Sequence, residues 1–122
     1  ERKKINIERC EKILISAMKQ SQNSILPQIN KPINFQHFLE KSQTNLYIAH
    51  CHKTPKKNFF KLIQGKLNPQ KITVMIGPEG DFTLEEVSMA EQKGATSVIL
   101  CKHRLRTETA GIYVANCMQI LF

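Results

Sequence analysis

The chain has 122 residues, of which 41% are hydrophobic and 23% charged, a balance that predicts one globular domain and excludes a disordered chain. No apolar run approaches the ~20 residues of a membrane span, and no signal-peptide pattern opens the sequence. The formal net charge of +8 favours a polyanionic partner, nucleic acid first, with a merely solubilising surface as the alternative.

The cysteines predict a reducing environment. Cys10, Cys51, Cys101 and Cys117 are widely spaced and form no Cys-x-x-Cys pair, which is typical of free thiols in a cytoplasmic protein. The sequence begins at Glu1 without an initiator Met, so we interpret it as a fragment that lacks an upstream part.

The first third of the chain predicts two helices. Apolar residues recur at three- and four-residue steps over residues 6–21, the pattern of an amphipathic helix. Prolines 27 and 32 interrupt this pattern, and Ile25-Leu26 is expected to begin a short strand. Asn34 is a candidate cap for a short helix that turns apolar side chains inward, namely Phe35, Phe38 and Leu39.

Residues 46–51 predict a strand that ends in a polar His50-Cys51-His52 sequence. These residues suggest a zinc site, but no second cluster has ligand spacing, so a polar strand end is favoured and no metal is expected. Lysines flank Pro55 in the next loop, and a helix carrying Phe59 and Ile63 is expected to end at Gly65.

The most informative stretch is Ile72 to Asp81. Ile72–Ile76 predicts a strand covered on both faces, and Gly77-Pro78-Glu79-Gly80 predicts a turn that uses the backbone freedom of its glycines. A capping box at Thr83 and Glu86 then starts a helix that Gly94 closes. Ligands of open α/β sheets bind beyond such strand ends. The acidic turn lacks a phosphate cradle, which disfavours a flavodoxin-like mononucleotide domain.

The last third predicts a strand, a cationic loop and a long helix. Residues 96–101 form the strand, and Thr107 is the expected N-cap of a helix over about 108–121. The apolar stripe of this helix is wide enough to pack against a second subunit as well. Strands alternating with helices predict an α/β fold with a mainly parallel sheet flanked by helices.

Two motifs together identify a family. Ile76-Gly77-Pro78-Glu79-Gly80-Asp81-Phe82 and the run from Leu100 to Ala110 resemble the hallmarks of RsmE-type ribosomal RNA methyltransferases of the SPOUT superfamily, which read Ile-Gly-Pro-Glu-Gly-Gly-Phe and Leu-Gly-x-Arg-Ile-Leu-Arg-x-Glu-Thr-Ala. The order and separation of the motifs match, and the resemblance extends over essentially all 122 residues.

The resemblance implies a C-terminal trefoil knot that holds S-adenosylmethionine, an obligate homodimer, and methylation of uridine N3 in 16S rRNA of the small ribosomal subunit. It also implies that the family's N-terminal β-barrel RNA-binding domain is absent from residues 1–122, and it calls for neither metal nor membrane. A non-catalytic RNA-binding or ribosome-assembly module of the same fold is the alternative. The intact runs Gly77-Pro78-Glu79-Gly80 and Arg106-Thr107-Glu108-Thr109 argue against it.

The resemblance also implies which residues line the cofactor site. Three segments supply them, with the first the weakest candidate: Ala49 and His50; Ile76, Gly77, Pro78, Glu79 and Gly80; and Leu100, Cys101, Leu105, Arg106, Glu108, Thr109 and Ala110.

Catalysis is expected to rest on Arg106 and Glu108. Methyl transfer to uridine N3 requires the uridine anion, which a cation beside the uracil oxygens stabilises. Arg106 is the candidate cation, with a phosphate-binding or dimer-contact role as the alternative, and Glu108 is expected to orient Arg106 or the cofactor. Glu79 is expected to cap amides of the turn. The sequence departs from the family pattern at Asp81, Cys101 and His103-Arg104.

Overall fold

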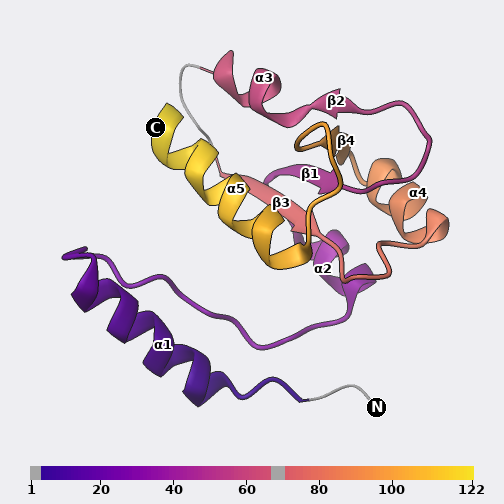
Figure 1. Cartoon of the computed structure of the whole chain (residues 1–122). Helices are drawn as coiled ribbons and strands as arrows, with labels where there is room; N and C mark the ends of the chain where they lie inside the picture. The colour runs from indigo at the N-terminus through magenta and orange to yellow at the C-terminus, as the bar shows by residue number, and fades with distance from the viewer. Residues whose placement is uncertain (1–3, 67–70) are drawn as a thin grey trace. The chain divides into compact units, whose positions relative to one another are not determined.

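The computed structural model describes residues 4–66 and 71–122. The chain divides into two compact units, residues 1–37 and 38–122, whose elements are drawn in Figure 1. No helix among the described residues is both long enough and apolar enough to cross a membrane.

The first unit contains the predicted helix α1, Ile7–Gln20, whose N-cap Asn6 accepts a hydrogen bond from the Arg9 amide. The strand expected at Ile25-Leu26 is wrong: these residues form no regular element, and both side chains are exposed. An extended segment instead leads to Asn34, whose side chain accepts from the Gln36 and His37 amides and starts α2, Phe35–Lys41. The predicted cap is therefore confirmed.

The second unit is built on a four-stranded parallel sheet, which confirms the predicted α/β class with a mainly parallel sheet. Its strands are β1 (Asn45–Ala49), β2 (Lys57–Asn58), β3 (Ile72–Ile76) and β4 (Thr96–Ile99), in the order β2-β4-β1-β3. β3 is thus an outer strand of this sheet, in which Met75 is buried and the other four residues are half-buried. Ile72, Val74 and Ile76 pack against the core on one face, and Met75 is buried on the other. Both faces of β3 are thus covered in part, as expected, although the apolar run could not show that β3 is an outer strand.

Helices α3 (Phe59–Gln64) and α5 (Thr107–Leu121) pack against one face of the sheet. The core of this layer combines strand and helix residues: Tyr47, Phe59, Ile63, Val98, Leu100, Ala110 and Cys117. Because side chains alternate along a strand, Ser97 points to the other face, where it donates to Glu91 of α4 (Leu84–Gln92) at 2.5 Å. The capping box of α4 forms as predicted.

A candidate active site at the ends of the parallel strands

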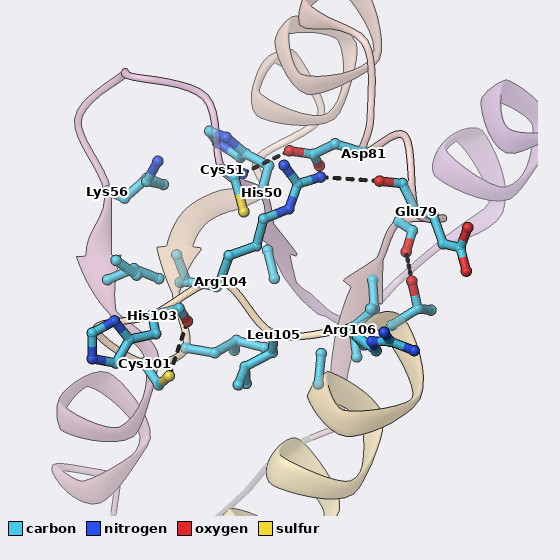
Figure 2. Close-up of a pocket in the computed structure, with 18 of the residues that line it drawn as sticks. His50, Cys51, Lys56, Glu79, Asp81, Cys101, His103, Arg104, Leu105 and Arg106 are labelled. Atoms are coloured by element: carbon cyan, nitrogen blue, oxygen red, sulfur yellow. Dashed lines mark hydrogen bonds between the residues drawn. The ribbon is translucent and has the colours of Figure 1, made fainter.

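A cavity of about 750 Å³ opens where the strands end. The register places Ala49 beside Ile76 on one side and Val98 on the other, so the loops that follow β1, β3 and β4 meet at one edge of the sheet. These loops line the cavity (Figure 2). Every cavity-lining residue belongs to the unit formed by residues 38–122.

In the turn after β3, the unusual backbone conformation belongs to a different residue from those expected from the sequence. The positive φ falls on Asp81, at 67°, and not on either glycine of the turn. Gly77 is required for space, because a Cβ there would lie 3.1 Å from the Phe82 ring and amide nitrogen. A Cβ on Gly80 would meet nothing within 4 Å. The expectation that both glycines supply backbone freedom is therefore wrong.

Asp81 connects this turn to the end of β1 by a hydrogen bond. Its carboxylate accepts from the Cys51 amide at 2.8 Å and from the Phe82 amide at 2.7 Å, while its own amide donates to the Pro78 carbonyl at 2.8 Å. Asp81 therefore performs the amide-capping role expected of Glu79, for whose exposed carboxylate no bond is recorded in the described part of the chain. Asp tolerates a positive φ better than most residues do, which suits it to a motif position where glycine is usual.

The first residue of α5 also forms a hydrogen bond with this turn. Thr107 donates its hydroxyl hydrogen to the Gly77 carbonyl at 2.8 Å. The helix N-cap is Arg106, with no side-chain cap bond, so the expectation of Thr107 as N-cap is wrong. The hydroxyl of Thr107 makes a bond to a residue 30 positions away, which a local capping rule cannot foresee.

The loop between β4 and α5 makes a further contact with the turn. An Arg104 Nη donates to the Glu79 carbonyl at 3.0 Å, and Cys101 Sγ donates to the His103 carbonyl at 3.0 Å (Figure 2). Lys56, Lys102, Arg104 and Arg106 together give the cavity four cations against the carboxylates of Glu79 and Asp81. The cavity thus favours an anion or an electron-rich group.

His50 is the buried polar residue of the cavity. It is 5% exposed, and neither ring nitrogen has a hydrogen-bond partner among the described residues. Burial, followed by the nearby Lys56 charge, lowers the pKa of His50 below its usual 6.5, so the ring is held neutral. A neutral imidazole offers one donor and one acceptor. Within the described residues, no group of three or more His, Cys, Asp or Glu side chains could hold a metal ion.

The cavity brings together most residues implied by the two motifs. It is lined by Ala49, His50, Ile76, Gly77, Pro78, Glu79, Leu100, Cys101, Leu105, Arg106 and Ala110. Gly80, Glu108 and Thr109 do not line it. The remaining residues of the lining were not among the site residues predicted from the sequence: Cys51, Lys56, Asp81, Val98, Ile99, Lys102, His103, Arg104 and Thr107. Most of these residues lie within a few residues of a strand end, and this position is the sequence feature that could have identified them.

The model of the RNA methyltransferase domain family matches residues 1–119. The chain belongs to this family. A ribosomal RNA small subunit methyltransferase E from Rickettsia conorii is 35% identical over 118 residues, which cover 96% of this chain and 48% of that relative. The resemblance to RsmE-type enzymes is confirmed.

Solved structures agree with this assignment to the RNA methyltransferase domain family. A probable rRNA-methyltransferase from Porphyromonas gingivalis has a TM-score of 0.87 and 34% identity, covering 99% of this chain and 51% of that one. A ribosomal RNA small subunit methyltransferase E from Neisseria gonorrhoeae, bound to S-adenosyl methionine, has a TM-score of 0.78 and 31% identity, covering 94% and 47%. The chain spans about half the length of the curated relatives it matches.

Proposed function

We propose that this chain is the catalytic domain of a cytoplasmic enzyme that transfers the methyl group of S-adenosylmethionine to N3 of a uridine in 16S rRNA. The single observation that carries the proposal is the cavity itself, which both motifs line from separate loops at the ends of β1, β3 and β4. The names of the relatives support rRNA as the substrate class, and the net charge of +8 suits a polyanionic partner.

The cavity fits the proposed cofactor. Its volume lies within the ~300–1,000 Å³ usual for small-molecule sites. Apolar side chains supply surface for a purine ring, among them Ala49, Leu100 and Leu105. The unpaired nitrogens of His50 supply a donor and an acceptor that nothing else among the described residues satisfies. The related structure from Neisseria gonorrhoeae contains S-adenosyl methionine, which supports the same cofactor here.

When bound, S-adenosylmethionine supplies an activated methyl group, so the chain must mainly position the acceptor and favour its anion. Arg106 is suited to this task because it lines the cavity at the N-terminus of the 15-residue helix α5. The guanidinium and the positive end of the helix dipole both favour an anion at this point. We therefore assign Arg106 the stabilisation of the uridine anion at the carbonyl oxygens of its uracil base.

Glu108 has a less direct role in this proposal. It lies in the first turn of α5, exposed and outside the cavity lining, and no ion pair with Arg106 is recorded among the described residues. A carboxylate in the first turn of a helix is favoured by the helix dipole. We propose that Glu108 and Thr109 support the start of α5, and with it the position of Arg106, while Gly80 shapes the outer turn.

The proposal includes the SPOUT-type trefoil knot and the homodimer. β4 lies between β1 and β2, so the chain leaving β4 emerges beside the loop 50–56 that joins those two strands. Passage of the chain through that loop is the arrangement we propose. For the dimer, α5 offers Ile112 at 63% and Ile120 at 75% exposure, on one helical face. This face differs from the predicted stripe, whose residues pack inward.

Calorimetric titration of the chain with S-adenosylmethionine tests the proposal, with FMN and ATP as matched controls. We expect saturable binding of S-adenosylmethionine alone, followed by incorporation of labelled methyl into small-subunit RNA at uridine N3. Binding of FMN or ATP instead would favour a mononucleotide domain. RNA binding without any S-adenosylmethionine binding would indicate the non-catalytic module.

A further inference from the structure

The turn after β3 is fixed from three sides, and the three contacts differ in position. Thr107 binds the Gly77 carbonyl at the base of the turn, and Asp81 binds the Cys51 amide on the side of β1. Arg104 binds the Glu79 carbonyl at the outer part of the turn. Figure 2 shows the Arg104 side chain extending from its loop across the cavity toward the turn.

The Arg104 contact has two chemical properties that decide how it can act. The acceptor is the backbone carbonyl of Glu79, so the contact does not depend on the Glu79 carboxylate. Arg104 is exposed and is paired with no carboxylate in the described part of the chain, so the contact can break and re-form in water. An exposed bond of this kind is weak enough to open during ligand exchange.

We propose that Arg104 is a positioning residue that ties the turn 77–82 to the loop 101–106 across the cavity and slows the release of bound ligand. This inference rests on the proposed function for the identity of the ligand, S-adenosylmethionine. The family pattern has Ile at this position, so the tie is a property of this chain and not of the motif. Ligand entry and exit require the Arg104 contact to open, while the Thr107 contact at the base stays in place.

The effect of the Arg104 contact on the turn can be measured without any ligand. The Asp81 amide is bonded to the Pro78 carbonyl inside the turn, so its hydrogen exchange reports opening of the outer turn. We expect Arg104→Ala to speed this exchange about three- to tenfold, the effect of one exposed hydrogen bond from a charged donor. Glu79→Ala is the matched control and should leave the exchange unchanged, because it keeps the accepting carbonyl.

Release of S-adenosylmethionine, followed by stopped-flow displacement, is the second measurement. Arg104→Ala should release the ligand about three- to tenfold faster than the unmodified chain. Arg104→Gln retains a donor without charge and should recover part of the slow release. Lys53→Ala removes an exposed cation that does not line the cavity, and it should release the ligand at the original rate.

The possible outcomes distinguish a failure of the proposed Arg104 role from a failure of the proposed function. Equal acceleration in Arg104→Ala and Lys53→Ala would overturn the inference, since total charge would then control release. Unchanged Asp81 exchange in Arg104→Ala would also overturn it. If the unmodified chain bound no S-adenosylmethionine while the exchange effect persisted, the proposed function would fail and the tie would stand. A drop in RNA affinity alone would make Arg104 a phosphate contact instead.

Discussion

Arg104 and Arg106 lie two positions apart on one loop, yet their surroundings suit them to different tasks. The Arg104 guanidinium is bonded to the turn after β3, whereas Arg106 occupies the N-cap of α5 with no side-chain cap bond. A cation at a helix N-terminus is unfavourable unless an anion binds there. Arg106 is therefore better placed to act on a charge that appears during the reaction.

We predict that Arg106→Ala slows methyl transfer about a hundredfold. This value is at the lower end of the ~10²–10³ typical for losing one donor to a developing oxyanion, because Arg106 is exposed and partly screened. Single-turnover rates with small-subunit RNA measure the effect. Affinity for S-adenosylmethionine should change much less, since its sulfonium gains nothing from a nearby guanidinium.

Two comparisons test the charge assignment for Arg106. Arg106→Lys should recover only part of the rate, because lysine keeps the charge and loses the planar fork. Higher pH should partly rescue Arg106→Ala, since more uridine is then already deprotonated. Normal single-turnover rates with weaker RNA binding and a smaller salt slope would instead make Arg106 a phosphate anchor.

His50 should make the stability of the fold depend on pH. Burial, then the Lys56 charge, lowers the pKa of His50 below 6.5 in the folded chain, with His52 acting the same way and Asp81 and Glu91 opposing. The unfolded chain therefore takes up the proton first, and the free energy of unfolding falls as pH drops below about 6.5 toward the lowered value.

We predict that His50→Leu weakens this pH dependence. Urea unfolding at pH 7.5 and at pH 5 should give a smaller difference in the variant than in the unmodified chain. At pH 7.5 the variant should be no less stable, because it removes a buried polar ring whose nitrogens have no partner in the described part of the chain. A variant with the original pH dependence would show that other groups cause it.

At the scale of elements, local signals predicted local structure. The capping box of α4 and the Asn34 cap of α2 depend on residues two or three positions apart, and both form as expected. The contacts that shape the candidate site join residues 25 to 30 positions apart, namely those of Thr107, Asp81 and Arg104. Such contacts depend on strand order, which sequence periodicity does not specify.

The turn after β3 gives a prediction that separates its two glycines. Gly77→Ala should lower the free energy of unfolding by about 1–3 kcal/mol, because the new methyl group would press on buried Phe82. Gly80→Ala should stay within about 0.5 kcal/mol, since it meets open space at an ordinary φ. Urea unfolding measures both. Equal losses would mean that the turn differs from the one described.

At the scale of the whole molecule, the sequence predicted the α/β class and left the strand order open. Thr96–Ile99 follows β3 in sequence, yet it enters the sheet between β1 and β2. The two-residue strand β2 is too short to produce a pattern. The cavity could be predicted because two loops carry recognisable motifs, whereas Lys56 reaches it only through the position of β2.

We predict a homodimer that depends on the exposed face of α5. Ile112→Glu combined with Ile120→Glu should shift sedimentation at micromolar concentration from two chains toward one, because a buried unpaired charge opposes association. Leu84→Glu is the matched control, since Leu84 is 60% exposed on α4. A single sedimenting chain in the unmodified protein would exclude the dimer.

The position of β4 also affects how the chain acquires its shape during synthesis. β1 and β2 cannot pair with their shared neighbour until residue 99 has left the ribosome, so their edges toward β4 stay open while about fifty more residues follow β1 and about forty follow β2. At ~5–20 residues per second this delay lasts seconds. A nascent chain that stalls before β4 would therefore present two unpaired edges to other chains, which favours aggregation over slow completion of the sheet.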